Sequence, residues 1–551
     1  MGGVARRVDG AYCGAPGDRR VKGTVASARF HNARIYTFDA KGTVAQAVAC
    51  CEGRVAAVGT DGEVRECFRR LSEVDLGGAV VLPAFCDAHV HLLALGLQAA
   101  GVSLDDAATK REAVDRVQRA ARAAAPGRWV VGRDWDASRW PEGLPTRADL
   151  DPVVPHPPVV LWSKDGHRVW CNSAALEAAG VTASTPDPPG GHIVRDPAGV
   201  PTGVLEEAAA SLVAGALPPP SEADVEAGLL RAQAELHRVG VASAHNMTGP
   251  TEGAEAFYGL QRLRSAGQLR LRVVAAIPEA HLDAAAQMGL RAGLGDGWLR
   301  LGFVKVFADG TLGSQTAAML DPYSGRPHDT GIAVHTREEL IALVRRASEA
   351  GWACAVHAIG DRANRWALDA FEASLEHSRR LGLRHRIEHA QLVHPADVSR
   401  FAWLGVVASM QPVHCPADRP LAERYWGERC RYAYAWRSLL QSGAVLAFGS
   451  DAPVETPDVL RGLYAAVFRK HPGDPGLPWF PEQALTVEEA VRAYTFGPAY
   501  AAGAEAHQGS LEVGKACDFV VLDRDVLEDP QGLASARVRM TVVGGEVVYQ
   551  A

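Results

Sequence analysis

The sequence predicts an α/β fold built around a TIM-like (β/α)₈ barrel, with a small β-sandwich domain formed from both termini and an inserted domain after the first barrel strand. Three observations lead to this prediction. Strand-like apolar runs alternate with helix-like stretches through the middle of the chain, both ends are rich in short strands, and one interval between successive strands is too long for a loop. At 551 residues the chain can bury a large core.

Both ends of the chain carry short strand-like runs separated by Gly and Asp turn signals. Near the N-terminus these include ARIYTF and AQAVACCEGRVAAVG, and near the C-terminus they are GSLEVGKACDFVVLD and VRMTVVGGEVVYQ. We therefore expect residues 24–80 and 505–551 to form one composite β-sandwich domain. Residues 1–23 lack the apolar segment of a secretory signal, and we expect a flexible lead-in there.

Residues 81–504 show the pattern expected of the barrel. We interpret the apolar run Ala79–Leu82, which ends at Pro83, as the buried first strand. Seven further apolar runs follow, at Gly240–His245, Leu271–Ile277, Leu301–Ala308, Ala353–His357, Leu383–His389, Gly405–Gln411 and Ala444–Gly449. Helix-like stretches such as REELIALVRRASEAG lie between most of them. Eight strands alternating with helices are typical of a (β/α)₈ barrel, although a doubly wound sheet has the same periodicity.

The interval between the first and second expected strands is exceptionally long. It covers residues 97–239, whereas loops between a strand and a helix usually have fewer than ten residues. We therefore expect this interval to be an inserted domain of mixed α/β character.

Composition narrows the class of protein. The net charge of −7 and the absence of Lys/Arg-rich runs argue against a nucleic-acid partner. No apolar run approaches the length of a membrane span, so we expect no membrane partner. The ten cysteines are scattered without a CxxC motif, which is typical of thiols in a reducing compartment and predicts a cytoplasmic protein.

Two histidines follow the run before Pro83. In an extended segment residues i and i+2 point to the same side, so His89 and His91 can both aim at one point beyond the end of the strand. Imidazole nitrogens that converge on one point suit a metal ion such as zinc. Two neighbouring histidines can equally be ordinary core or surface residues, so the interpretation depends on ligands from elsewhere in the chain.

Other polar residues also fall at the ends of expected strands. His357 ends ACAVH, His389 ends RHRIEH, and Asp451 follows AVLAFGS. Taken singly, each histidine could be a hydrogen-bonded structural residue and the aspartate a turn or cap residue. In a barrel, however, the C-terminal ends of the strands lie on one face and carry the catalytic groups. The regular series therefore favours one shared metal site.

Lys305 lies inside the apolar run LGFVKVFADG. A lysine buried among apolar side chains is costly unless it is neutral or paired. A third option is carbamylation by CO₂, which would convert the amine into an anionic oxygen ligand able to bridge two metal ions.

The chain resembles the amidohydrolase superfamily, and within it the amidohydrolase 3 or YtcJ-like subgroup that includes N-substituted formamide deformylase-like proteins. The segments that carry the resemblance are LPAFCDAHVH, LWSKDGHRVWCNSAAL, GFVKVFADGTLGSQTAAM, AVHAIGDRAN, HRIEHAQL and FGSDAPVETPD. The HxH pair with a later His, His and Asp indicates only the superfamily. DGHxxxxN and FADGTLGSxT point to the subgroup, and the resemblance extends from about Ala28 to the C-terminus.

The resemblance implies a role for each strand-end residue. It implies that His89, His91 and Asp451 bind one metal, that His357 and His389 bind a second, and that carboxylated Lys305 bridges the two. The implied cofactor is a divalent metal, and we expect zinc. The number of ions is one or two, because some members of the superfamily use a single metal. A metal-activated hydroxide would attack the substrate carbonyl, and Asp451 would be the catalytic base and then the acid.

Further residues are candidates for contacting the substrate. Trp162, Asp165, His167 and Asn172 lie in the inserted segment, where the alternative is an internally bonded Asp-Gly turn. Four more follow barrel strands: Asp309, Thr311, Gln315 and His414. For His414 the alternative is a surface histidine.

These features favour a metal-dependent hydrolase of a non-peptide C–N bond, in an amide or an N-substituted formamide. Deamination of a ring, cyclic amide hydrolysis or isomerisation on the same scaffold is the enzymatic alternative, because the sequence does not define the shape of the substrate site. A catalytically silent binding or structural relative is the alternative of another class, but such a protein would be expected to have lost ligands. The expected partner is a small amide-type substrate, and a homodimer is compatible with the fold although no motif indicates it.

Overall fold

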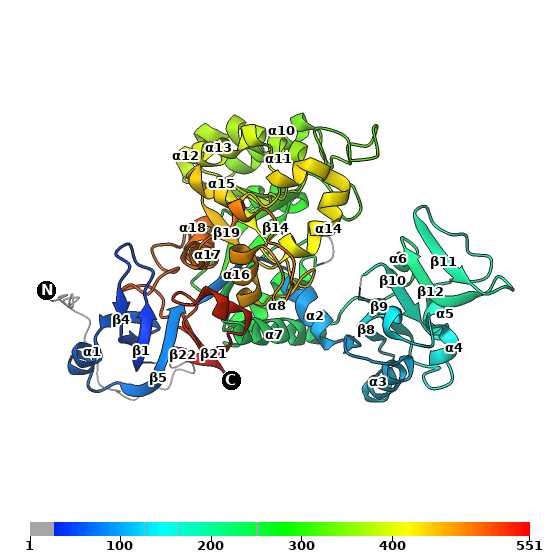
Figure 1. Cartoon of the computed structure of the whole chain (residues 1–551), viewed down its shortest axis with the longest axis horizontal. Coiled ribbons are helices and arrows are strands. Elements are labelled where there is room, and N and C mark those ends of the chain that lie inside the picture. The colour runs from blue at the N-terminus through cyan, green and yellow to red at the C-terminus, as the bar shows by residue number, and fades with distance from the viewer. Residues whose placement is uncertain (1–26, 126, 165, 250–251) are drawn as a thin grey trace. The chain divides into compact units, whose positions relative to one another are not determined.

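A computed structural model describes residues 27–125, 127–164, 166–249 and 252–551 (Figure 1). The expected lead-in, residues 1–23, therefore lies outside the described residues. The chain divides into two compact units. One contains Met1–Ala94 and Ala232–Ala551, and the other contains Leu95–Arg231. Within the described ranges, no helix is both long and apolar enough to cross a membrane.

Strands from both termini form one eight-stranded sheet. Its main path runs β22-β21-β20-β5-β1-β3-β4, with the short β2 paired to β1, and β1 and β5 are parallel. The bounds are β1 (Ala28–Tyr36), β2 (Val44–Ala45), β3 (Ala47–Cys51), β4 (Arg54–Gly59), β5 (Ser72–Pro83), β20 (Phe519–Leu522), β21 (Val538–Val543) and β22 (Glu546–Gln550). Buried side chains from both ends of this path, such as Val48 and Val542, share one apolar core. In this core the rings of Phe30 and Phe519 pack edge to face, with their centroids 4.8 Å apart.

The middle of the chain forms the predicted barrel. Eight parallel strands follow one another in chain order, from β6 through β13 to β19. The bounds are β6 (Phe85–Val90), β13 (Val241–Asn246), β14 (Arg272–Pro278), β15 (Leu299–Phe307), β16 (Ala353–Ala358), β17 (Arg386–His389), β18 (Val407–Met410) and β19 (Leu446–Phe448). The last and first strands meet where the Asp451 N–H donates to the His89 carbonyl at 2.7 Å. The α/β barrel class is therefore confirmed, and a doubly wound sheet is excluded.

The prediction for the first barrel strand was wrong. The run before Pro83 belongs to β5 of the terminal sheet, where it pairs with β20, and the first barrel strand is β6. The chain changes sheets within two residues, because the Ala84 N–H donates to the Asp518 carbonyl and the Phe85 N–H donates to that of Gly240. Apolar residues continue across this junction on both sides, so composition alone does not mark it.

Helices follow most of the barrel strands. They include α8 (Glu255–Ser265), α10 (Arg337–Glu349), α11 (Asp361–Ala373), α13 (Pro395–Leu404), α14 (His414–Trp426), α15 (Trp436–Gln441), α16 (Val459–Phe468), α17 (Val487–Tyr494) and α18 (Phe496–Ala501). Figure 1 shows α10, α11 and α13 packed side by side. Local sequence explains where several begin: a capping box starts α10 at Thr336 and Glu339, and another starts α17 at Thr486 and Glu489.

The inserted unit has its own sheet and core. The strand order is β11-β12-β10-β9-β8-β7. The bounds are β7 (Val102–Ser103), β8 (Val130–Trp135), β9 (Val159–Ser163), β10 (Arg168–Cys171), β11 (Gly191–Arg195) and β12 (Pro201–Glu207), with α3 (Lys110–Ala123), α5 (Ser173–Ala178) and α6 (Ala210–Ala214). Trp135, Trp140 and Trp170 pack together, with ring centroids 6.0–6.5 Å apart. Helices α2 (Leu92–Ala100) and α7 (Glu222–Arg238) join this segment to the barrel sequence.

Gly449 lies where the segment after β19 passes close to the backbone of β6, and this close packing leads to a prediction. A Cβ on Gly449 would lie 2.4 Å from the His89 backbone nitrogen, so Gly449→Ala must push the two strands apart. We expect this variant to lower the free energy of unfolding by about 1–3 kcal/mol in chemical denaturation. Gly62→Ala is the matched control, because nothing lies within 4 Å of that position and alanine favours its helix. Equal stability of Gly449→Ala and the wild type would contradict the described closure.

Candidate metal centre

The structure brings the strand-end residues together at the carboxyl end of the barrel. His89 lies within β6 and His91 just after it, while His357 and His389 lie near the ends of β16 and β17. The ring centroids of His89 and His389 are 5.0 Å apart, and those of His357 and His389 are 4.5 Å apart. Four histidines from three strands therefore surround one small region.

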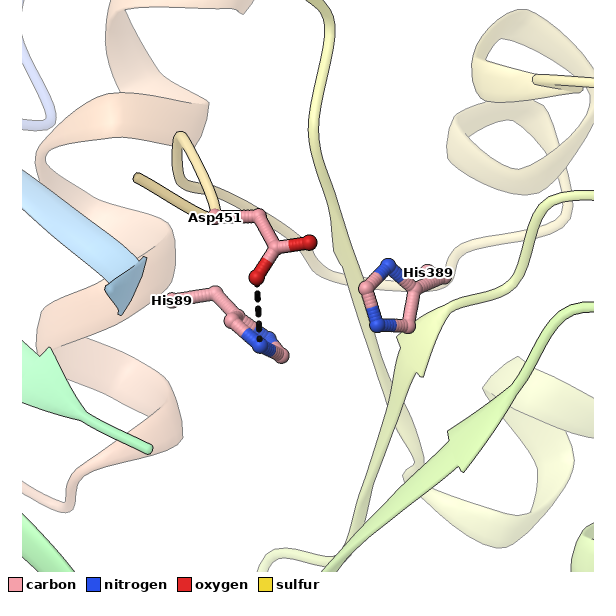
Figure 2. Close-up of side chains that lie close together, drawn as sticks. All are labelled: His89, His389 and Asp451. Atoms are coloured by element: carbon pink, nitrogen blue, oxygen red, sulfur yellow. Dashed lines mark ion pairs between the residues drawn. The ribbon is translucent and has the colours of Figure 1, made fainter. Parts of the chain in front are cut away.

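Asp451 points into this region. One ligand atom from each of His89, His389 and Asp451 lies within 4.8 Å of the others, and all three side chains are buried. Figure 2 shows these side chains turned toward one another. The Asp451 Oδ1 atom lies 3.3 Å from Nε2 of His89 and 3.3 Å from Nε2 of His91. Asp451 thus faces both members of the HxH pair.

The hydrogen bonds of His89 define its tautomer. Its Nδ1 lies 2.6 Å from Oε2 of the buried Glu388. Burial alone would raise the pKa of Glu388, but Arg386 and His89 outweigh it and hold that pKa well below its usual range. Glu388 is therefore an ionised acceptor, and His89 Nδ1 carries the proton. Burial, with the nearby Lys305, lowers the pKa of His89 to about 4, so the ring is neutral and Nε2 bears a lone pair.

The tautomer of His89 shows whether this group of residues suits a metal ion. A lone pair on His89 Nε2 and a carboxylate oxygen of Asp451 face each other at 3.3 Å, which is unfavourable unless a cation lies between them. Two ligands bound tetrahedrally to one zinc ion at 2.0–2.1 Å are themselves about 3.3 Å apart. The donor set and its spacing therefore point to a divalent metal.

The imidazole rings of His357 and His389 are also neutral. His357 Nε2 donates to the Gly310 carbonyl at 3.0 Å, which leaves the lone pair on Nδ1. Burial and the nearby Lys305 lower the pKa of His357 to about 3. Burial and His357 hold the pKa of His389 well below its usual value. Neutral imidazole is the form that coordinates metal ions.

Lys305 is buried near these groups without a counter-ion. Only 2% of its surface is exposed, and among the described residues it has no hydrogen-bond or ion-pair partner. Its Nζ lies 4.8 Å from the centroid of the Phe307 ring. Burial lowers the pKa of Lys305 to about 8, although Glu388 and Asp451 oppose that shift. A lone buried amine of this kind is unusual in a structural core and suits a functional role.

Two of the clustered residues have strained backbones. His389 has a φ of +73° and Asp451 a φ of +61°, in the left-handed region that non-glycine residues rarely adopt. Such conformations cost roughly 1–3 kcal/mol each and persist where the surroundings enforce them. They turn both side chains toward the cluster in a way that strand periodicity does not predict.

Sequence reasoning missed a charged network behind His89. Arg386 is fully buried and pairs with Glu388, and it also donates to His245 Nδ1 at 2.7 Å, to the Ala88 carbonyl and to Ser409 Oγ. The sequence HRIEH contains a pattern that indicates this network. The charged residues Arg386 and Glu388 flank the apolar Ile387, so in a strand both charged side chains point to the same face. A charged pair in a buried barrel strand has to face the interior, so this pattern could have been recognised.

Asp87 was also missed. Its carboxylate accepts from the backbone N–H of His89 and of Ser450, both at 3.0 Å, and from the Ser450 hydroxyl at 2.5 Å. Burial raises the pKa of Asp87 to about 6. Asp87 therefore fixes the segment that carries His89 to the segment that carries Asp451.

The predicted substrate residues of the barrel fall into two groups. His414 is buried and faces the cluster, because its Nε2 lies 3.8 Å from Asp451 Oδ2 and has no hydrogen-bond partner among the described residues. Asp309 is also buried, but it accepts from the backbone N–H groups of Ala318, Ile359 and Gly360, which gives it a structural role in joining two loops. Thr311 is exposed and Gln315 half-buried in the loop after β15.

The other predicted substrate residues belong to the inserted unit. Trp162 is half-buried in β9, packed against the core. Asn172 is fully buried, caps α5 through Ala175 and donates to the carbonyls of Val154 and Pro157, and these bonds account for its presence. His167 is exposed and lies 3.1 Å from Glu207. Asp165 lies outside the described residues.

Comparison with known proteins agrees with the geometry of the candidate site. A model of the amidohydrolase family matches residues 72–549. The putative amidohydrolase YtcJ of Bacillus subtilis is 32% identical over 530 residues, covering 95% of this chain and 99% of YtcJ. The N-substituted formamide deformylase of Arthrobacter pascens is 33% identical over 541 residues, covering 94% of this chain and 97% of that enzyme.

Solved structures give the same result. The crystal structure of an uncharacterized metal-dependent hydrolase from Pyrococcus horikoshii is similar with a TM-score of 0.75 and 30% sequence identity. The match covers 92% of this chain and 99% of that chain. The similarity therefore extends over the terminal sheet, the barrel and the inserted unit rather than over one of them.

The contact between Glu388 and His89 leads to a prediction. Glu388→Gln keeps the shape but removes the charge that holds the His89 proton on Nδ1 and balances Arg386. We expect the affinity for Zn²⁺, measured by competition with a chelator, to fall about 10–100-fold. Because Arg386 would be left buried and unpaired, we also expect the free energy of unfolding to fall by about 3–5 kcal/mol.

Glu372→Gln is the matched control for this experiment. Glu372 is half-exposed and pairs with Arg400 on the barrel exterior, so its loss should change neither quantity measurably. Unchanged Zn²⁺ affinity in Glu388→Gln would show that the orientation of His89 does not depend on Glu388.

Proposed function

This chain belongs to the amidohydrolase family, a family of metal-dependent hydrolases, and from that premise we propose that it hydrolyses a non-peptide C–N bond in an amide or an N-substituted formamide. The observation that carries the proposal is the position of Asp451, whose carboxylate faces the Nε2 atoms of His89 and His91 at 3.3 Å. The choice of bond is supported by the similarity to the N-substituted formamide deformylase over nearly the whole chain.

In the proposed centre, His89, His91 and Asp451 would hold one ion. His357 and His389 would hold a second ion, and carboxylated Lys305 would bridge the two. Imidazole nitrogens and carboxylate oxygens are ligands that zinc accepts, and we propose zinc as the metal. A bound metal of this kind supplies Lewis acidity, which lowers the pKa of water and polarises a carbonyl oxygen.

The environment of Lys305 supports its carboxylation. Carbamate formation requires the neutral amine, whose nitrogen bonds to the carbon of CO₂ while a proton leaves for solvent. Because burial lowers the pKa of Lys305 to about 8, far more of the neutral amine is present near neutral pH than for an ordinary lysine with a pKa of 10.5. The carbamate would also place a negative charge near the neutral rings of His89, His357 and His389, where the present structure has only an amine.

Asp451 is the proposed proton carrier. Burial would raise the pKa of Asp451, but that pKa lies well below its usual range, and the hydrogen bond with His91 contributes to the lowering. At neutral pH the carboxylate is therefore ionised and can accept a proton from the attacking water. Because its acid form gives up a proton readily, it can then protonate the nitrogen of the leaving amine.

The proposal is tested with metal-loaded protein and a panel of N-formyl amines, N-acyl amines and cyclic amides. We expect turnover of at least one member, release of the free amine, and loss of activity on chelation that Zn²⁺ restores. Asp451→Asn should reduce kcat by about 10²–10⁴-fold because an amide cannot carry the proton. The zinc content of Asp451→Asn, measured in parallel, should remain above that of the chelated protein.

Asp321→Asn is the control with the same chemical change on an exposed residue. Its kcat should equal that of the wild type. The proposal fails if the zinc-loaded wild type releases no amine from any member of the panel, or if Asp451→Asn turns substrate over at the wild-type rate.

A further inference from the structure

A cavity of about 960 Å³ lies at the end of the barrel opposite the metal centre. Its walls come from the amino-terminal ends of β13, β14 and β15 and from the terminal sheet, including Asp518 and Gly544. We call it the lower cavity. Its size is within the range of sites that hold small organic ligands. The strand-end histidines and Asp451 are not among its lining residues, so the lower cavity is distinct from the candidate metal centre.

Three of the five arginines that line the lower cavity are neutralised by a carboxylate, and a fourth, the exposed Arg54, donates to the Gly514 carbonyl. Arg272 lies 2.7 Å from Asp518, Arg264 lies 2.7 Å from Asp296, and Arg270 lies 2.7 Å from Glu546. These ion pairs brace the cavity wall. The charge of each of these three arginines is balanced by its carboxylate partner.

Arg300 differs from these three arginines. Among the described residues no carboxylate lies within ion-pair distance of Arg300, and its one hydrogen bond goes to the Ala502 carbonyl at 2.8 Å. The nearest acidic side chain that influences it is Glu505, which is already held by both Nη atoms of Arg384. Burial lowers the pKa of Arg300, but a guanidinium remains charged at neutral pH. The lower cavity therefore contains a half-buried cation without a counter-charge.

The groups beside Arg300 are uncharged. Cys86 and Ser243 are register partners on β6 and β13 and also line the cavity. Burial raises the pKa of the Cys86 thiol to about 12, so it stays protonated. Burial and the nearby Arg386 hold the pKa of His245, which also lines the cavity, well below its usual value. Within the part of the chain that the structure describes, no carboxylate pairs with Arg300, and the hydrogen-bonded Ser243 hydroxyl and Cys86 thiol line the same end of the cavity.

We propose that the lower cavity binds a small organic anion whose carboxylate or phosphate group pairs with Arg300. A guanidinium binds either group through two parallel hydrogen bonds. The remainder of the wall offers apolar surface from Val274, Leu269 and Trp298 for the organic part of the ligand. The ion pairs of Arg264, Arg270 and Arg272 keep the cavity open without occupying Arg300.

The test measures binding of two probes to the metal-loaded protein by isothermal titration calorimetry. The probes are inorganic phosphate and benzoate, with neutral benzamide as the control ligand. We expect at least one anion to bind the wild type and Asp451→Asn equally, and to bind Arg300→Gln at least about tenfold more weakly. Arg264→Gln removes a paired arginine from the same cavity and should keep the wild-type affinity.

The two probes identify the ligand class. Binding of phosphate alone indicates a phosphate ester, and binding of benzoate alone indicates a carboxylate. The proposal is overturned if neither anion binds, if benzamide binds as well as benzoate, or if Arg300→Gln keeps the wild-type affinity. Should Arg300→Gln fail to fold, wild-type crystals soaked in selenate decide the question: an anomalous peak beside Arg300 is expected, and its absence from the lower cavity refutes the proposal.

Discussion

The contact on which the rest of this site depends is the one between Asp451 and the HxH pair. It exists only because the last barrel strand closes against the first, through the bond from the Asp451 N–H to the His89 carbonyl and through Asp87, which binds both segments. Gly449 permits this approach, since any side chain there would collide with the backbone of His89. Barrel closure therefore also brings the proposed metal ligands together.

A column of buried polar groups extends from this contact through the barrel. Glu388 orients His89, Arg386 balances Glu388, and His245 accepts from Arg386 and lines the lower cavity. A buried ion pair contributes little net stability, but removing one partner is costly, so such a pair holds a specific geometry well. Part of the barrel interior therefore holds buried polar groups that orient the side chain of His89 instead of apolar packing.

The apolar runs predicted seven of the eight barrel strands, because a strand buried on both faces reads as a continuous apolar segment. The same property hid the boundary at Pro83, where β5 and β6 are both apolar but belong to different sheets. The strand-end position brought the histidines and Asp451 together correctly in space. The left-handed φ of His389 and Asp451, and the pairing of Arg386 with Glu388, depend on contacts between distant strands. Spacing along the chain carries no information about such contacts, and the same holds for the unpaired state of Arg300.

The most direct test of the proposed centre is the metal content of the purified protein, measured by elemental analysis together with that of Lys305→Ala. A bridged pair of ions predicts about two transition-metal ions per chain in the wild type and about one in Lys305→Ala. Lys41→Ala, which changes an exposed lysine, should match the wild type. A wild-type protein that is fully active without metal would contradict the account, and equal metal content in Lys305→Ala and the wild type would exclude a bridging role for Lys305.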